Sequence, residues 1–398
     1  MIISDRMAEA LKNGSMVRKM FEEGIRLKAE HGKGNVFDYS LGNPDLPPPE
    51  SFINGLRDAV TGGEVSGVHG YMPNGGWPEV REAVAAYLTE TNPGIKVPFA
   101  AEHAVMTVGA AGGMNCVFKA ILDPGDEVIA LAPYFMEYRF YVDNHGGLLK
   151  VAETDDRFRP VPDKVLAAVT PRTRAVIINT PNNPTGAVYT ASELKSLGDA
   201  LDEASKRLAR PVLLVSDEPY RKIVFGGCAA PSVFEAYSHS IVVTSFSKDL
   251  SIPGERIGYA AINPAMEGAG ELSGALVLAN RILGSVNAPS LMQRVVKGIL
   301  KDSAELGIYE GRSKILADAL TDLGYELVRP QGTFYLFPKS PLEDDLAFTE
   351  TLRRELILAV PGIGFARPGY FRLSLCLDGD MIVKSLTAFA KALARAKA

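Results

Sequence analysis

The feature that most constrains the fold is a regular succession of short apolar runs and helical stretches between residues 77 and 246. The apolar runs are AVMTVG (104–109), EVIALAP (127–133), RAVIINT (174–180), VLLVSDE (212–218) and SIVVTSF (240–246). Runs with so few polar residues are typical of strands buried on both faces of a sheet. Because helical stretches separate several of them, the sequence predicts an α/β domain whose mainly parallel sheet is covered by helices on both faces.

The pattern changes after about residue 290, where a second and smaller unit is expected. A helical stretch over 289–324 leads into GTFYLFP, and a helix, a Gly/Pro-rich loop, the strand FRLSLCL and a terminal helix follow. This order favours a small α+β domain. An amphipathic helix is expected over residues 5–31. We therefore expect an N-terminal segment that packs with the small domain (1–47), a large domain (48–289) and the small C-terminal domain (290–398).

Composition argues against several classes of protein. The 398-residue chain has a net charge of −5, so a chain-wide basic surface for nucleic acid is absent. Its three cysteines (Cys116, Cys228 and Cys376) are far apart and follow no metal-binding or disulfide pattern. The N-terminus is too polar and acidic for a signal peptide, and no apolar run approaches the roughly 20 residues of a membrane span. We expect a cytoplasmic protein with free thiols, no metal site and no membrane contact.

Polar residues gather where the predicted strands end. Ligands of open α/β sheets bind outside the carboxyl ends of the strands. These ends carry GAAGG (109–113), PNNPTG with Asn183, DEPY with Asp217 and Tyr220, and SFSK with Lys248. GAAGG precedes a helix expected over about 112–122. Each signal taken alone also fits an ordinary structural role, such as a tight turn, a helix cap or a solvated lysine.

Together, however, these residues form a coherent chemical set. The candidates are Asn183, Asp217, Tyr220, Ser245, Ser247, Lys248 and Arg256. A helix N-terminus offers free N–H groups to a phosphate, to which the serines and the arginine would add hydroxyls and a positive charge. The lysine is an amine that can bond a carbonyl carbon once its pKa is lowered. The aspartate can hold a protonated pyridine nitrogen, and the tyrosine and asparagine can hydrogen-bond a phenolate oxygen. The set matches the needs of pyridoxal 5'-phosphate.

At this point the chain resembles a known family, the class I and II aminotransferases, which are fold type I pyridoxal phosphate enzymes and include aspartate aminotransferase. The segments that carry the resemblance are GNPDLPPPE, GYMPNGGWPEVREAVAAYL, TVGAAGGMNCVFKAILDPGDEVIALAPYF, NTPNNPTGAVY, VSDEPY, SFSKDLSIPGERIGY, GTFYLF and FRLSL. They occur in the family's order and cover nearly the whole chain. Such an ordered series is far more specific than any single motif.

The resemblance implies a role for each matching residue. The catalytic residues would be Lys248, which bonds the cofactor and carries the substrate proton, Asp217 on the pyridine nitrogen, and Tyr220. Further cofactor contacts would come from Asn183, Ala110, Ala111, Phe135, Ser245, Ser247, Arg256 and, across a homodimer, Tyr71. The substrate carboxylate would be held by Arg372 and Gly42, with Asn183 beside them. Phe135 and Tyr71 also fit an ordinary place in the core.

The implied activity is ping-pong transfer of an α-amino group between an L-amino acid and a 2-oxo acid, for which a 2-oxoglutarate-type acceptor is reasonable. A C–S β-lyase on the same fold would use the same lysine, aspartate and arginine, so it stays an alternative. A non-catalytic sensor fused to a DNA-binding domain is more remote, because the chain begins almost at once with the expected N-terminal helix.

The residues leave the choice of amino acid open. Some relatives place a lysine in the phosphate loop to meet a distal carboxylate, but this chain has Gly109–Ala110–Ala111 there. Arg281 lies six residues before Asn287, close to the place where other relatives carry an arginine that reaches the neighbouring subunit's substrate. It could equally be a surface or interface arginine. Aromatic or aliphatic substrates would fit the apolar residues near Gly42 and Phe135.

Overall fold

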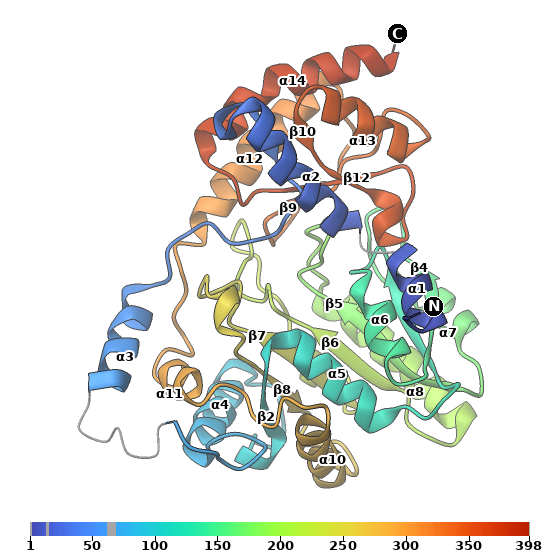
Figure 1. Ribbon diagram of the computed structural model, residues 1–398. Helices are drawn as coiled ribbons and strands as arrows, with labels where there is room; N and C mark the ends of the chain where they lie inside the picture. Colours follow the sequence, from blue (N-terminus) through green and yellow to red (C-terminus); the bar gives the residue numbers. More distant parts are fainter. Residues whose placement is uncertain (1, 13–15, 62–68, 398) are drawn as a thin grey trace.

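The computed structural model describes residues 2–12, 16–61 and 69–397, and a seven-stranded sheet lies at its centre (Figure 1). The strand order is β2-β8-β7-β6-β5-β3-β4, and only β8 runs antiparallel to its neighbours. The strands are β2 (Ala104–Thr107), β3 (Glu127–Ala132), β4 (Leu148–Glu153), β5 (Thr173–Asn179), β6 (Leu213–Asp217), β7 (Ser240–Ser245) and β8 (Gly258–Ile262). The prediction of a mainly parallel sheet is confirmed.

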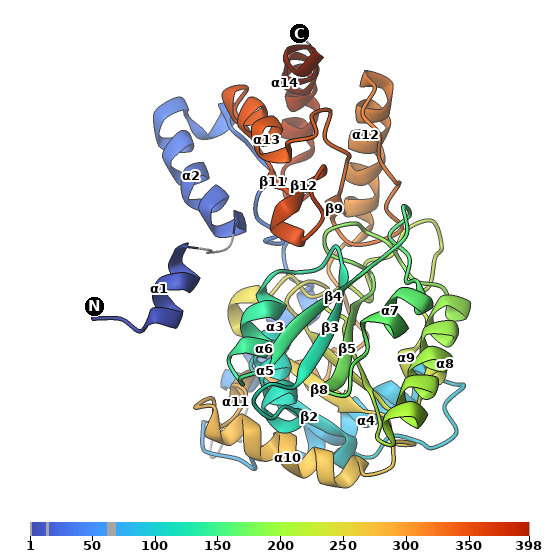
Figure 2. The ribbon, with the colours of Figure 1, turned by 90° about the vertical axis from the view of Figure 1, so that its right-hand side faces the viewer.

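Helices cover both faces of this sheet, as predicted (Figure 2). Alternate strand residues enter different cores: Val105 and Val128 pack with one set of helices, whereas Met106 and Ile129 pack with the other. The first face carries α5 (Gly109–Ile121), α6 (Glu137–Asp143) and α10 (Ala269–Ile282). The second carries α4 (Pro78–Thr91), α7 (Pro162–Ala168), α8 (Ala191–Leu208), α9 (Val233–Ala236) and α11 (Ser290–Lys297), with α3 (Glu50–Thr61) against α11.

The smaller α+β unit is also present, at the top of Figure 1. It contains a three-stranded antiparallel sheet of order β11-β12-β9 and a parallel pair, β1 with β10. Its strands are β1 (Phe37–Asp38), β9 (Tyr335–Leu336), β10 (Ile357–Leu358), β11 (Val360–Pro361) and β12 (Phe371–Ser374). Its helices are α12 (Gly307–Leu323), α13 (Asp345–Arg354) and α14 (Gly379–Lys397). The β1–β10 pairing places the N-terminal segment against this unit.

Two of the expected helices differ from the structure. The stretch over 5–31 forms α1 (Asp5–Lys12) and α2 (Met16–His31), and residues 13–15 between them lie outside the described residues. The stretch over 289–324 is helical only in α11 and α12. In the non-helical segment between them, the carbonyls of Leu300 and Asp302 accept hydrogen bonds from the Lys222 ammonium.

Short 3-10 turns complete the chain: η1 (Lys33–Asn35), η2 (Ala101–His103), η3 (Pro253–Glu255) and η4 (Gly362–Phe365). Within the described part of the chain, no helix is both long and apolar enough to cross a bilayer. The carboxyl ends of β5, β6 and β7 meet the start of α5 at the edge of the sheet that faces the smaller unit (Figure 1). The fold therefore gathers the motifs at the ends of those strands in one place.

Candidate active site

A cavity of about 470 Å³ lies at this edge of the sheet, and we call it the main cavity. Nearly all of the predicted site residues line it: Gly42, Ala110, Ala111, Phe135, Asn183, Asp217, Tyr220, Ser245, Ser247, Lys248, Arg256 and Arg372. Two candidates do not. Tyr71 is 92% exposed, and Arg281 is exposed at the end of α10. The main cavity is thus lined both by residues at the strand ends and by residues of the smaller unit.

Lys248 reaches this cavity from the segment that follows β7. Its ammonium donates a hydrogen bond to the carbonyl of Gly42, at 2.7 Å. Burial lowers the pKa of Lys248 to about 8, and the positive charges of Arg372 and Arg256 act in the same direction. At neutral pH a usable fraction of the amine is therefore available as a nucleophile.

Asp217 is the last residue of β6, and its two carboxylate oxygens differ in their surroundings. Oδ2 accepts a hydrogen bond from the buried Tyr138 hydroxyl at 2.6 Å, whereas Oδ1 has no partner among the described residues. Burial raises the pKa of Asp217 to about 7, against the opposing effects of the Tyr138 hydrogen bond and the Lys248 charge. A cationic ring N–H in the main cavity would satisfy Oδ1 and hold the carboxylate ionised.

The opposite end of the cavity is suited to an anion. Helix α5 begins at Gly109, three residues earlier than predicted, so Ala110 and Ala111 lie in its first turn, which no side chain caps. Gly109 has a φ of +64°, and a Cβ there would lie 2.7 Å from Nη2 of Arg256. The close approach of the guanidinium therefore requires a glycine. Free helix N–H groups beside an arginine form a phosphate-binding arrangement.

Arg372, on β12, is 2% exposed. It donates to the side-chain oxygen of Asn183 at 3.1 Å and to the carbonyl of Ser40 at 2.5 Å, while its Nε has no partner among the described residues. Its guanidinium stacks between the rings of Tyr335 and Phe365. Arg372 has no carboxylate partner among the described residues, and a buried guanidinium in that state is costly unless an anion binds to it.

Asn183 and Tyr220 also line the main cavity. The backbone N–H of Asn183 donates to the side chain of Asn179 at 2.6 Å, and Asn179 donates in turn to the carbonyl of Asp217 at 2.7 Å. The hydroxyl of Tyr220 lies 3.2 Å from that of Tyr335. This chain of hydrogen bonds fixes the ends of β5 and β6 relative to each other.

Five residues at or beside this cavity were not predicted from the sequence. Asn179 ends β5, so the rule that ligands bind at strand ends points to it. Tyr335 lies within the motif GTFYLF and packs on Arg372. Tyr138 had no comparable signal, because its contact with Asp217 spans 79 residues and depends on how α6 packs on the sheet. Phe21 and Leu41, which add apolar surface to the cavity, were missed for the same reason.

The donor set fits pyridoxal phosphate. The main cavity combines a buried amine of lowered pKa, a carboxylate oxygen that lacks a partner, an uncapped helix start beside an arginine, and a second buried guanidinium. Among the described residues, no cluster of His, Cys, Asp and Glu side chains is suited to hold a metal ion.

Comparison with known proteins agrees with this reading of the site. The sequence profile of the family "Aminotransferase class I and II" matches residues 35–389. The chain is 35% identical to an aspartate/prephenate aminotransferase of Thermus thermophilus, over 90% of this chain and 91% of that protein. It is 32% identical to an aspartate aminotransferase of Geobacillus stearothermophilus, over 87% of this chain and 88% of the relative.

Solved structures are similar over the same extent. A crystal structure of an aminotransferase from Eubacterium rectale matches with a TM-score of 0.96 and 37% identity, and each chain is covered completely. An aspartate aminotransferase from Thermus thermophilus with maleate matches with a TM-score of 0.85 and 31% identity, over 96% of this chain and 97% of the other. The chain therefore belongs to the class I and II aminotransferases and is a pyridoxal phosphate-dependent aminotransferase of fold type I.

Proposed function

We propose that the enzyme transfers an α-amino group from an L-amino acid to a 2-oxo acid within the main cavity, by a ping-pong mechanism. The observation that carries the proposal is that Lys248, Asp217 and Arg372 line one cavity. When bound, pyridoxal phosphate supplies an aldehyde carbon that an amine can attack and a ring that accepts electrons from Cα. Residues of the enzyme bind and orient the substrate and transfer the proton.

Each residue has a defined task in this proposal. The Arg372 fork binds the substrate α-carboxylate and so orients the Cα–H bond toward Lys248. The Lys248 amine would take the proton from Cα and deliver it to the cofactor carbon that carries the aldehyde. Asp217 keeps the ring nitrogen protonated, with the Tyr138 hydroxyl holding the carboxylate in place. Asn183 and Tyr220 would hydrogen-bond the ring's oxygen, and Phe135 would pack on the ring.

The phosphate group would be held at the start of α5. Ala110 and Ala111, in the uncapped first turn of α5, line the same cavity as Ser245, Ser247 and Arg256 and would offer their N–H groups to the phosphate. The backbone of Gly42 would contact the substrate carboxylate. The lack of a side chain there matters, because a Cβ would lie 1.8 Å from the Tyr335 hydroxyl.

We propose an acidic pair, aspartate and 2-oxoglutarate, as donor and acceptor. The support comes from the relatives, which are named aspartate and aspartate/prephenate aminotransferases. The positively charged residues that line the main cavity are Lys248, Arg256 and Arg372, all of which already have tasks. A distal carboxylate would then need a cation from a second subunit, and the exposed Arg281 is our candidate.

We also propose a homodimer. Tyr71 is exposed and does not line the main cavity of its own chain, which suits a residue that reaches the cofactor phosphate of a neighbouring subunit. Leu278 and Ile282 on α10 are large apolar side chains that are more than half exposed, as expected of a surface that a partner covers. A cytoplasmic location is proposed from the three cysteines, all of which are free thiols.

A single-turnover screen tests the proposal. The loaded enzyme is mixed with one amino acid at a time, and the loss of the cofactor's visible absorbance and the release of a 2-oxo acid are followed. Aspartate should react fastest, and 2-oxoglutarate should restore the absorbance. Release of pyruvate and ammonia from cystathionine without any 2-oxo acid acceptor would favour the β-lyase instead. Unchanged absorbance with every amino acid would contradict transamination.

A further inference from the structure

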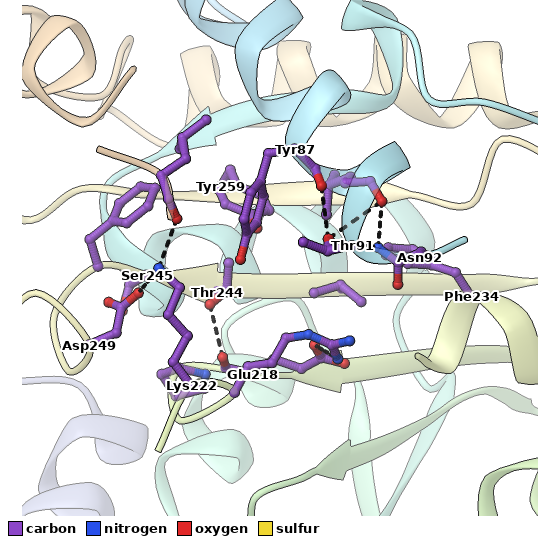
Figure 3. Close-up of a pocket in the computed structure, with 16 residues that line it drawn as sticks. Tyr87, Thr91, Asn92, Glu218, Lys222, Phe234, Thr244, Ser245, Asp249 and Tyr259 are labelled. Atoms are coloured by element: carbon purple, nitrogen blue, oxygen red, sulfur yellow. Dashed lines mark hydrogen bonds and ion pairs between the residues drawn. The ribbon is translucent and has the colours of Figure 1, made fainter. Parts of the chain in front are cut away.

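A second cavity of about 30 Å³ lies beside the main cavity, and Ser245 and Pro219 line both. We call it the back cavity. Figure 3 shows side chains from α4, β7, β8 and the segments after β6 and β7 converging on it, with Glu218, Lys222 and Asp249 among them. It contains several buried charged groups that the proposed reaction does not use.

The chain alternates between the two cavities at both key residues. Asp217 lines the main cavity and the next residue, Glu218, lines the back cavity; Lys248 lines the main cavity and the next residue, Asp249, lines the back cavity. At residues 217–218 the alternation follows from the extended backbone at the end of β6, whereas residues 246–249 form a turn. The consequence of the alternation is that whatever holds each acid in the back cavity also restrains the backbone of the residue that faces the cofactor.

The two acids are held in different ways. Glu218 pairs with Arg221, three residues further along the same turn, at 2.9 Å. Asp249 pairs with Lys222, which comes from a different segment, at 3.1 Å. Only the second pair connects the loop after β6 to the loop that carries Lys248.

Lys222 also reaches a third segment. Its ammonium donates to the carbonyls of Leu300 and Asp302 at 2.7 and 2.8 Å, and with Asp249 these acceptors account for its three N–H groups. The N–H of Ala304 donates to the carbonyl of Asp249 at 2.7 Å. These hydrogen bonds connect the segment between α11 and α12 to Asp249, the residue next to Lys248.

We propose that Lys222 is a positioning residue for Lys248: by binding Asp249 and the 300–302 carbonyls, it fixes the reach of the Lys248 amine toward the cofactor and Cα. The inference rests on the proposed function. Lys222 itself does not line the main cavity, so it acts only through Asp249 and the backbone. Its removal leaves a largely buried carboxylate without its cation, which should loosen residues 247–250.

The principal test is Lys222→Met, with Asp249→Asn as a second variant that keeps the shape of its side chain. The single-turnover rate with the best amino acid should fall by about tenfold to about a hundredfold, since small displacements of a catalytic group have effects of this size. The deuterium isotope effect at Cα should rise, because proton transfer becomes more limiting. Cofactor-free full-length protein should also regain visible absorbance about tenfold more slowly on addition of pyridoxal phosphate.

Glu127→Gln is the matched control. Glu127 is 1% exposed and pairs with Arg172 at 3.0 Å. It begins β3, however, and so lies at the amino ends of the parallel strands, whereas the main cavity lies at their carboxyl ends. This variant should lose stability with no change in the isotope effect or in the rate of cofactor uptake. If Lys222→Met and Asp249→Asn behave in the same way as Glu127→Gln, per folded molecule, the positioning role is refuted. If wild type itself neither takes up cofactor nor reacts with any amino acid, the proposed function fails instead.

Discussion

The Asp217→Asn variant should lose most of the activity. Its cofactor-free form, however, should become increasingly more stable than cofactor-free wild type as the pH rises. Burial raises the pKa of Asp217 from 3.8 to about 7. A carboxyl group with a raised pKa in the folded state favours folding while it is protonated, and this contribution is lost between the unfolded and the folded pKa. Since each tenfold change in proton affinity is worth about 1.4 kcal/mol, wild type should lose roughly 3 kcal/mol from this group between pH 5 and pH 8.

Asparagine carries no charge to bury and still offers an oxygen to the Tyr138 hydroxyl, which lies 2.6 Å from Asp217. The assay is urea unfolding of cofactor-free protein at pH 5 and pH 8. The matched control is Asp322→Asn, which removes the same charge from an exposed position on α12. The free energy of unfolding of Asp217→Asn relative to this control should rise by roughly 3 kcal/mol over that interval. An equal pH dependence in both variants would refute the reasoning.

Three further predictions concern the loaded enzyme. Tyr138→Phe removes the donor to Asp217 and should lower kcat/KM by about tenfold or more, whereas Tyr134→Phe on the neighbouring turn should not; equal steady-state values for the two variants would exclude the role. Arg372→Lys keeps the charge but loses the planar fork, so the KM for the amino donor should rise by about a hundredfold; an unchanged KM would place the carboxylate elsewhere. Tyr71→Phe should weaken cofactor binding by about tenfold in a protein that light scattering shows to be dimeric, and a tightly binding monomer would contradict a shared site.

Local sequence patterns were enough to find the large sheet because its strands are buried on both faces. Two strands of the sheet, β4 and β8, were not predicted from the sequence, for physical reasons. β4 lies at the sheet edge and most of its residues are exposed, so it lacks a continuous apolar run. β8 consists of GYAAI, whose glycine and alanines have low strand propensity, and its fully buried position follows only from its neighbours β2 and β7.

The site residues also divide into those marked by a local sequence pattern and those that depend on packing between distant segments. Residues at strand ends, such as Asp217 and Asn183, were found because parallel strands bring their carboxyl ends to one edge. Lys248 and Arg372 were placed in one site by the family resemblance, and the structure brings them to one cavity. Contacts that depend on packing between distant segments, such as that of Tyr138 with Asp217, have no local pattern to mark them.

The central claim is that Lys248 bonds the cofactor. It is tested most directly by reducing the loaded enzyme with borohydride, which makes the bond between an amine and the cofactor permanent, and by locating the modified peptide by mass spectrometry. The claim predicts one equivalent of pyridoxyl phosphate on Lys248 and none on the Lys248→Ala variant. A label on another lysine, or the same yield from the variant, would contradict it.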